Sequence, residues 1–322
     1  MNKLFSLLRS IFQYDVKEIL NAFMVKPSLK DEKSITKFYS LNKEYDNICQ
    51  KYYLGNNSST QNSIGYDWGS WSGKIRNTFK TNVPINFLAN PLIAYTMVFQ
   101  RNKGVKETQD RLNYIKKIFN PEIMQNILRE DYIGGPVISN SFFKTSANRA
   151  HHTLHLASYF ESTKKYFWES SSIIEFGGGY GNMARLIRKM NPNMTYIIVD
   201  LPELLALQYV YLGSLESEEN LNIFSSKSDS IKIGKINLIS SNLIYSNEIS
   251  IHAESFISTW ALSECPNFLQ KFVIENDFFS ASNILIASLV DANNCMGDLI
   301  ENKNLSTVKV PFLNGNHEYW MR

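Results

Sequence analysis

The sequence predicts an α/β protein in which a helical N-terminal region precedes a doubly wound sheet of mainly parallel strands. Up to about residue 170, apolar residues recur at three- and four-residue spacing, which indicates amphipathic helices. From residue 171 onward, short apolar segments alternate with helical ones, the pattern of strands that helices cover on both faces. The first of these strands runs into a glycine cluster, as at a tight turn from strand to helix: Gly177, Gly178, Gly179 and Gly181.

The N-terminal region, residues 1–146, is predicted to be helical. Two prolines, Pro91 and Pro121, each follow an asparagine and each begin a helix, because proline suits the first turn. The segment 65–73 is rich in glycine and serine and is predicted to be a loop. Apolar periodicity predicts further helices over residues 4–23, 41–54 and 106–119.

The remaining part of the chain, residues 147–322, is predicted to form a second domain that contains the sheet. A helix over residues 147–160 leads into it. The predicted strands are 173–176, 196–199, 236–240, 255–259, 284–289, 307–312 and 318–321, and the last is expected to run antiparallel. The predicted helices between them are 182–190, 203–211 and 267–276.

Composition excludes several classes of protein. The net charge is only +3 and the lysines are dispersed, so no basic surface for nucleic acid is expected. The apolar N-terminal segment is interrupted by charges such as Arg9 and Asp15, so it is not expected to span a membrane. Three distant cysteines, Cys49, Cys265 and Cys295, have no metal-ligand spacing, which favours reduced thiols in a cytoplasmic protein.

The segment from Ile173 to Asn182 carries the clearest chemical signal. An apolar strand enters the glycine cluster, where the absence of a Cβ lets the backbone approach a ligand. The next strand ends in Asp200, and a carboxylate there can accept hydrogen bonds from both hydroxyls of a ribose. A dinucleotide-binding fingerprint would have glycine at position 182, which disfavours a nicotinamide-dependent oxidoreductase. A tight turn without a ligand is the other alternative, but it would not require Asp200.

The spacing of glycines 177, 179 and 181 after Glu175 resembles the first motif of class I S-adenosylmethionine (SAM)-dependent methyltransferases. Together with Asn191-Pro192 and the run from Asp200 to Glu203, it resembles the caffeate type of small-molecule O-methyltransferase. The whole pattern over 147–322 also looks like the bacterial sugar O-methyltransferases. The resemblance implies a Rossmann-like class I methyltransferase sheet, SAM as the cofactor, and a small hydroxylated acceptor, with a sugar or glycan intermediate expected.

The resemblance also implies which residues bind the cofactor. They are Glu175, Gly177, Gly178, Gly179, Gly181, Asp200, Leu201, Asn242 and Trp260. In caffeate-type enzymes a histidine shortly after the fourth strand removes the proton of the acceptor, but this chain has Ser263 at the matching position. Glu264 beside it is therefore a candidate base, since partial burial can raise the pKa of a carboxylate. A glutamate that only caps a helix or contacts solvent is the alternative.

Three of the five histidines fall in one helical turn, which suggests a functional face. His151 and His155 are four residues apart and share that face, while His152 lies three residues from His155. His151 and His155 are therefore candidate bases, and a purely structural histidine face is the alternative. No metal is expected, because no nearby carboxylate completes a ligand set. His317, in a predicted hairpin, is a further candidate base.

The expected partner is a small-molecule acceptor, without nucleic acid. The N-terminal region is expected to form the acceptor side or a lid over it, and it is a candidate surface for a homodimer. Because Ser263 replaces the family histidine, a SAM-binding subunit without catalytic activity is an alternative function. Methylation of nucleic acid is a further alternative, which the absence of a basic surface disfavours.

Overall fold

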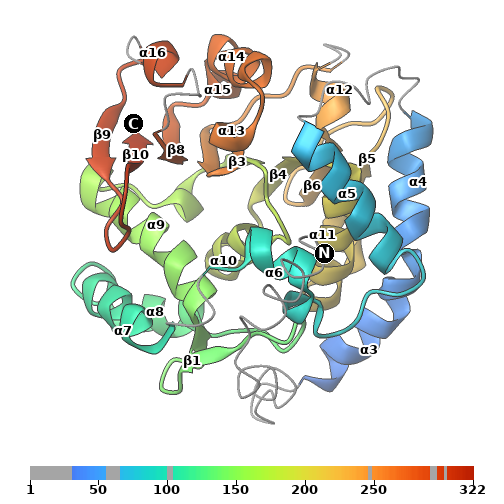
Figure 1. Ribbon diagram of the computed structural model, residues 1–322, viewed down its shortest axis with the longest axis horizontal. Helices are drawn as coiled ribbons and strands as arrows, with labels where there is room; N and C mark the ends of the chain where they lie inside the picture. The colour runs from blue at the N-terminus through green and yellow to red at the C-terminus, as the bar shows by residue number, and fades with distance from the viewer. Residues whose placement is uncertain (1–30, 56–65, 100–103, 246–248, 291–295, 301–302) are drawn as a thin grey trace, which may run out of the picture.

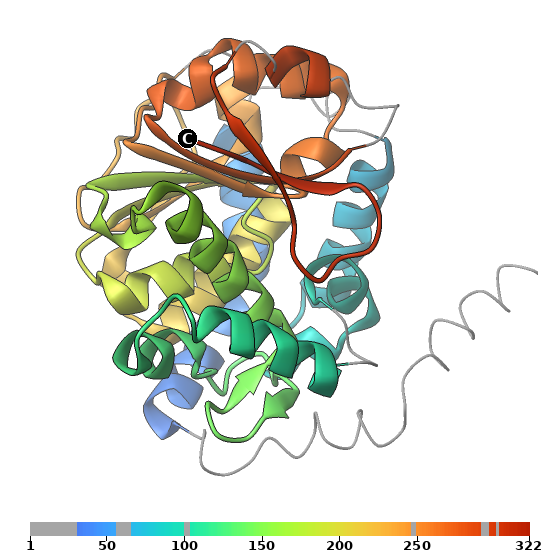
Figure 2. The same cartoon turned by 90° about the vertical axis from the view of Figure 1, so that its left-hand side faces the viewer.

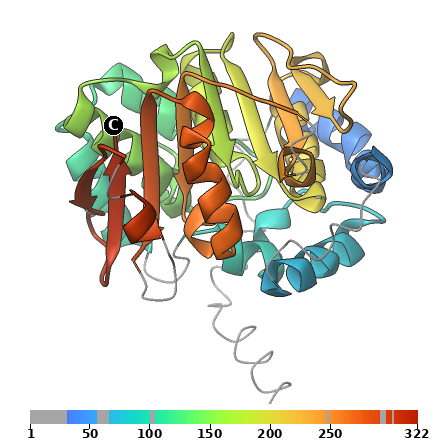
Figure 3. The same cartoon turned by 90° about the horizontal axis from the view of Figure 1, so that it is seen from above.

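The structure is a computed structural model that describes residues 31–55, 66–99, 104–245, 249–290, 296–300 and 303–322. At its centre lies an eight-stranded sheet with the order β5-β6-β4-β3-β7-β8-β10-β9 (Figure 3). The strands are β3 (Ser172–Phe176), β4 (Thr195–Asp200), β5 (Leu221–Phe224), β6 (Ile236–Ser240), β7 (Ser255–Thr259), β8 (Asn283–Leu289), β9 (Ser306–Lys309) and β10 (His317–Met321).

The direction of the strands matches the predicted fold class. All neighbouring pairs from β5 to β8 run parallel, whereas β10 runs antiparallel to both β8 and β9. Figure 2 shows the hairpin of β9 and β10 at one edge of the sheet. The sheet is Rossmann-like, and its last strand runs antiparallel as predicted. Each predicted strand is present, but β5 was not predicted.

Helices cover both faces of the sheet, because successive strand residues point to opposite sides. In β3, Ile173 belongs to one apolar core and Ile174 to the other. The first core contains α9 (Ala147–Thr163), α10 (Asn182–Met190) and α11 (Pro202–Leu215). The second contains α12 (Ser241–Tyr245), α13 (Ala261–Glu264), α14 (Asn267–Glu275), α15 (Asp277–Ser280) and α16 (Met296–Ile300).

The N-terminal helices pack against the first of these faces. They are α3 (Glu32–Leu41), α4 (Tyr45–Gly55), α5 (Tyr66–Phe79), α6 (Pro91–Met97), α7 (Gly104–Ile115) and α8 (Pro121–Leu128). α3, α4 and α5 contact α11, and α7 contacts α9 (Figure 1). α11 is apolar on all sides, and every residue from Pro202 to Ser214 is buried. The apolar core is therefore continuous from the N-terminal helices to the sheet.

Capping explains several helix boundaries. The side chains of Asn90 and Asn120 accept backbone N–H groups at the starts of α6 and α8, where proline occupies the first turn as predicted. Ser146 ends the short strand β2 (Thr145–Ser146), which pairs with β1 (Ile138–Asn140), and it caps α9. The predicted division of the chain between 146 and 147 falls at this cap, but two separate domains stay a prediction.

The N-terminal region differs from the prediction in one segment. The prediction of a loop over 65–73 is wrong, because α5 begins at Tyr66 and continues to Phe79. The physical reason is packing: Ile75 and Phe79, four residues apart, are buried in the core and outweigh the low helix propensity of the glycines. The helix predicted over 4–23 lies outside the described residues. No described helix is both long and apolar enough to cross a bilayer.

Candidate active site

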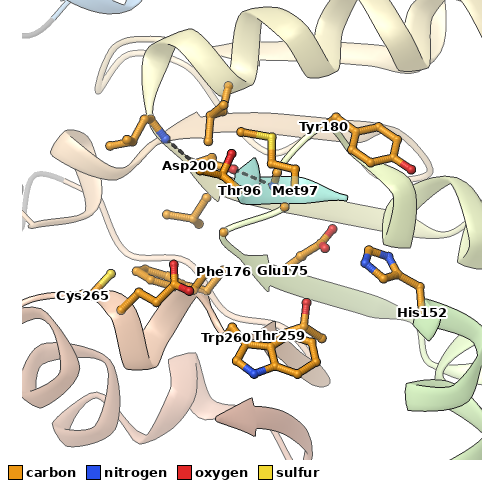
Figure 4. Close-up of a pocket in the computed structure, with 18 of the residues that line it drawn as sticks. Thr96, Met97, His152, Glu175, Phe176, Tyr180, Asp200, Thr259, Trp260 and Cys265 are labelled. Carbon is orange, nitrogen blue, oxygen red and sulfur yellow. Dashed lines mark hydrogen bonds between the residues drawn. The ribbon is translucent and has the colours of Figure 1, made fainter. Parts of the chain in front are cut away.

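A cavity of about 430 Å³ opens at the carboxyl ends of β3, β4 and β7. The chain passes from β3 to β4 on one side and later returns to β7 on the other, so the cavity lies where the strand order reverses. Figure 4 shows Glu175 and Asp200 at these strand ends, between Met97 on one side of the cavity and Trp260 on the other. The N-terminal region supplies part of the wall through the segment that runs from Tyr95 to Phe99.

The glycine cluster forms the floor of this cavity. Gly177 has φ +78°, and a Cβ on it would lie 2.0 Å from the Cβ of Ala261. A Cβ on Gly178 would lie 2.7 Å from a methyl group of Ile198. Neither position has room for a side chain, so the backbone itself faces the cavity there, as it does at Gly179. Gly181 does not line the cavity and instead makes the turn into α10.

Asp200, the last residue of β4, is held by three hydrogen bonds. Its Oδ2 accepts from the backbone N–H of Gly179 at 3.1 Å and from Nε2 of Gln208 at 2.9 Å. Its Oδ1 accepts from the backbone N–H of Leu201 at 2.8 Å. Burial raises the pKa of this carboxyl to about 7, although the hydrogen bonds act in the opposite direction. The carboxylate is thus fixed in one orientation beside the cavity, which Leu201 also lines.

Glu175 presents a second carboxyl to the cavity from β3. Its side chain is nearly buried, and Oε2 accepts a hydrogen bond from the hydroxyl of Tyr196 at 3.0 Å. Burial raises the pKa of Glu175 to about 8, against the effect of the Tyr196 bond, and the nearby Asp200 raises it further. At neutral pH this group therefore holds a proton, which a cation bound in the cavity would displace.

The start of α12 offers polar atoms that lack partners. Oγ of Ser241 and Oδ1 of Asn242 are buried, and no described residue forms a hydrogen bond with either atom. Ser241 lines the cavity, as does Tyr245 one turn later. Asn242 itself is not part of the cavity wall.

Trp260 forms the opposite wall in a strained backbone conformation. Its φ is +64°, which is uncommon for a bulky side chain, and its backbone N–H donates to the carbonyl of Ala287 at 2.7 Å. The indole Nε1 donates to Nδ1 of His317 at 3.2 Å. Partial burial lowers the pKa of His317, which also lines the cavity. The strained turn therefore aims a flat apolar surface at the cavity.

His151 lies between two aromatic rings of this wall. Its ring centroid is 3.8 Å from that of Phe99, with the planes 15° apart, and 5.2 Å from that of Trp260, with the planes 23° apart. Neither ring nitrogen has a hydrogen-bond partner among the described residues. Burial, assisted by the other histidines and a nearby arginine, lowers the pKa of His151 well below its usual value. The imidazole is therefore neutral and has a free lone pair.

The other two histidines of the cluster are placed differently. His152 lines the cavity, and its Nδ1 accepts a hydrogen bond from Nδ2 of Asn182 at 3.0 Å. Burial lowers its pKa to about 3, so the neutral ring carries its proton on Nε2. His155 is fully buried behind the wall and does not line the cavity. Its Nδ1 lies 2.6 Å from the hydroxyl of Tyr319.

Glu264 lies at the rim of the cavity, where its side chain remains accessible to solvent. The surrounding walls still raise its pKa by removing part of its hydration. Ser263, the position of the family histidine, does not line the cavity, because its hydroxyl donates to the carbonyl of Trp260 at 2.8 Å.

The sequence did not indicate the contribution of residues 95–99. They comprise the end of α6 and the two residues after it, and the backbone N–H of Phe99 donates to the side chain of Asn148 at 2.9 Å, which fixes them beside α9. This contact joins residues 49 positions apart, so no local pattern could reveal it. Among the described residues that line the cavity there is no lysine or arginine. Where the chain is described, no cluster of three or more potential metal ligands occurs.

No protein-family model matches the sequence, and no curated protein matches it either. Solved methyltransferase structures resemble parts of it. PigF with SAH is 13% identical over 51% of this chain and 53% of its own, with a TM-score of 0.35. Mitomycin 7-O-methyltransferase is 12% identical over 54% of this chain and 55% of its own, with a TM-score of 0.36. Human N-acetylserotonin methyltransferase in complex with SAM is 10% identical over 87% of this chain and 66% of its own, with a TM-score of 0.34.

The match to the first two structures spans about half of their length. Because the TM-scores are low, the fold class rests on the strand order and direction described above.

Proposed function

We propose that this chain is a SAM-dependent O-methyltransferase that acts on a small hydroxylated acceptor, with a sugar or glycan intermediate as the expected substrate. The observation that carries the proposal is the arrangement of Asp200 and the glycine floor at the reversal of strand order. A fixed carboxylate beside a backbone without side chains is suited to the hydroxyls of a ribose and to the close approach of the ligand.

The residues around the cavity fit this cofactor. Asp200 would accept hydrogen bonds from the two ribose hydroxyls, and Glu175 would pair with the ammonium of the amino-acid part. Gly177 and Gly178 have no room for a Cβ, so their backbone, with that of Gly179, would face the cofactor directly. The remaining predicted contacts are Leu201, Asn242 and Trp260, with Ser241 added because its unpartnered hydroxyl lines the cavity and with Gly181 retained as the turn that places the loop. The bound cofactor would supply an electrophilic methyl group.

His151 is the candidate base that the geometry favours. It is neutral, it lines the cavity, and both of its ring nitrogens lack partners, so one of them can accept the proton of an acceptor hydroxyl. The flat rings of Phe99 and Trp260 hold the imidazole in place. His152, with its proton on Nε2, is suited to donate a hydrogen bond to the acceptor. Positioning of this kind supplies much of the acceleration in an in-line displacement.

The other candidate bases are less well placed. Glu264 lies at the open rim, and His317 already accepts the Trp260 hydrogen bond on one nitrogen. His155 would have to act through His151, because its ring lies behind the wall at a centroid distance of 4.5 Å from that of His151. We therefore assign His155 a supporting position and retain Glu264 and His317 as alternatives.

The N-terminal region would form the acceptor side of the site. Residues 95–99 lie opposite the strand ends and provide both an aromatic surface and the ring that orients His151. The homodimer and the cytoplasmic location stay predictions.

The charge of the cavity disfavours an oxidoreductase. The cavity is lined by the carboxyl groups of Glu175, Asp200 and Glu264, and its described lining has no lysine or arginine. A pyrophosphate would therefore lack a counter-charge there. A subunit that binds SAM without catalysis makes a different prediction from an enzyme. Such a subunit would bind the cofactor, but it would have no methyl-transfer activity for a substitution of His151 to reduce.

Calorimetric titration with S-adenosylhomocysteine tests the cofactor site. Wild-type protein should bind with micromolar affinity, and Asp200→Ala should lose at least about 100-fold, since two charge-assisted hydrogen bonds disappear. Glu254→Ala is the matched control, because that carboxylate lies far from the cavity and bonds to Ser171. Binding of a nicotinamide dinucleotide instead would overturn the proposal.

A second measurement tests the base. His151→Gln should reduce the rate of methyl transfer to a responsive hydroxylated acceptor by about 100-fold or more while S-adenosylhomocysteine binding is unchanged. The control is His252→Gln, an exposed histidine whose ring bonds only to serines. Equal activity in both variants would exclude His151 as the base.

A further inference from the structure

Asn148 forms two hydrogen bonds that connect two separate parts of the cavity wall. It lines the cavity from the first turn of α9, and its exposed fraction is only 3%. Its Oδ1 accepts from the backbone N–H of Phe99 at 2.9 Å, and its Nδ2 donates to the hydroxyl of Tyr180 at 3.0 Å. A backbone N–H can only donate, so the carbonyl end of the amide must face Phe99 and the amino end must face Tyr180. One side chain therefore uses both of its polar ends.

The first partner, Tyr180, belongs to the glycine loop that would contact the cofactor. The residue before it, Gly179, donates its backbone N–H to the carboxylate of Asp200 at 3.1 Å. The ring of Tyr180 is buried, and it packs edge to face against the rings of Phe87 and Tyr211. The hydroxyl of Tyr180 is therefore fixed relative to the floor of the cofactor site.

The second partner, Phe99, belongs to the wall that orients the candidate base. Its ring stacks on that of His151 at a centroid distance of 3.8 Å. Asn148 precedes His151 by three residues on α9, so the two side chains lie on the same side of the helix. Within the described part of the chain, no other hydrogen bond joins the segment 95–99 to α9. The bond to Asn148 therefore determines how this wall is attached.

We infer that Asn148 is a positioning residue that holds the wall beside the candidate base in register with the cofactor loop. This inference rests on the proposed function of the cavity. One end of the chain of contacts is Asp200, which Asn148 reaches through Tyr180 and the backbone of the glycine loop. The other end is His151, which it reaches through Phe99. An in-line displacement depends on the relative placement of methyl group, acceptor oxygen and base, and this chain of contacts would maintain that placement.

Hydrogen exchange with and without saturating S-adenosylhomocysteine tests this inference. In wild type, the ligand should slow amide exchange in the glycine loop and also in the segment 95–99. Asn148→Leu has nearly the same shape without the polar atoms. The glycine loop of this variant should still be slowed, but the slowing at 95–99 should fall by about fivefold, as expected for a lost hydrogen bond. Tyr180→Phe removes only the bond on the cofactor side and should have the same effect, so it gives the answer even if Asn148→Leu does not fold.

A conservative variant should rescue the response. In Asn148→Asp, an ionised carboxylate can accept from both Phe99 and Tyr180, and a protonated one can accept from the first and donate to the second. This variant should therefore retain the slowing at 95–99 that Asn148→Leu loses.

Asn237→Leu is the matched control for a purely structural loss. Asn237 is fully buried, and its Nδ2 donates to the carbonyls of Lys232 and Lys235 near the start of β6, at the end of the sheet opposite the cavity. The variant should lower the Tm, but the ligand should slow exchange at 95–99 as much as in wild type. A loss of stability alone therefore cannot imitate the expected effect.

The two proposals can fail separately. Wild-type protein that does not bind S-adenosylhomocysteine would overturn the proposed function and with it the role of Asn148. If the ligand binds and slows the segment 95–99 equally in wild type, Asn148→Leu and Tyr180→Phe, only the positioning role is overturned. Equal losses in Asn148→Asp and Asn148→Leu would also overturn it, because the coupling would then not depend on the two hydrogen bonds.

Discussion

Two buried arginines of this protein, Arg149 and Arg111, have opposite surroundings. Both have an exposed fraction of 0%. Arg149 pairs with Glu130 at 2.8 Å and with Asp131 at 3.0 Å, whereas Arg111 has only the face of Phe99. Burial opposes the charge of both, yet the pKa of Arg149 is raised, chiefly by Glu130, while that of Arg111 is lowered. Burial alone therefore does not determine the pKa of a buried arginine, because the neighbouring carboxylates also contribute.

The paired arginine explains how the histidine cluster is positioned. Arg149 and Arg185 both bond to Asp131, which ties α9 to α10. His151 and His152 lie two and three residues after Arg149 on α9, so this ion cluster fixes the helix that presents them to the cavity. The unpaired arginine lies on α7, across the same helix. One buried charge is therefore balanced by carboxylates, and the other has no carboxylate partner among the described residues.

The largest expected effect separates the two arginines by stability. Arg149→Met should lower the free energy of unfolding by about 3–5 kcal/mol, because Glu130 and Asp131 would remain buried without their partner. Arg111→Met should not lower it. Urea denaturation of both variants measures the difference. Equal losses in the two variants would remove the basis of the comparison.

The contrast extends to the carboxyl groups, where pH tests it. Burial alone would raise the pKa of Asp131, but Arg185, Lys189 and Arg149 outweigh it and hold the pKa well below its usual range. Glu175 lacks such partners and has a pKa of about 8. Its folded-state pKa lies above its unfolded value, so its contribution to stability is present at low pH and is lost as pH rises toward and through 8.

Glu175→Gln should remove this loss. The Tm of the variant should rise relative to that of wild type between pH 5 and pH 8 in the absence of ligand, by the equivalent of about 1.4 kcal/mol for each pH unit, and the gain should level off above pH 8. Glu254→Gln is the control, because hydrogen bonds from Ser171 lower the pKa of Glu254 and the variant should show no such gain. Parallel profiles of Tm against pH for wild type and Glu175→Gln would contradict a raised pKa for the Glu175 carboxyl.

A smaller effect should follow from giving Arg111 an internal partner. Thr108→Asp places a carboxylate one turn away on the same helix and should stabilise the protein by about 1 kcal/mol relative to Thr108→Asn, which has the same shape without the charge. The comparison of the two variants by urea denaturation isolates the charge. If the two variants are equally stable, Arg111 does not form an ion pair with a carboxylate at position 108.

Most of the fold could be predicted from the sequence, because parallel strands buried on both faces leave continuous apolar segments. β3, β4 and β7 were found in this way, and the antiparallel direction of β10 was predicted as well. The strand β5 was not predicted, since it has only four residues and lies at the edge of the sheet. The loop predicted over 65–73 failed because tertiary packing overrode the local signal of its glycines.

The candidate site divides in the same way. Asp200 and the glycines could be predicted because local backbone geometry demands them, and Glu175 and His151 lie beside them on the cavity wall. The part of the wall from Tyr95 to Phe99 could not be predicted, because its contact with α9 joins residues far apart in the sequence. The sequence also carried a signal for the unusual burial of Arg111, which shares the apolar face of its helix with Leu112 and Ile115, where a charged residue is unexpected.

The burial of α11 on every side has a consequence for how this architecture can change over evolutionary time. A helix with one apolar stripe can lose its covering layer and keep its solubility, but α11 would expose apolar surface on its outer side without α3 and α4. We therefore expect that the N-terminal helices cannot be replaced by an unrelated domain without changes in α11. New substrates are expected to arise through substitutions in the cavity wall, with both parts of the chain inherited together.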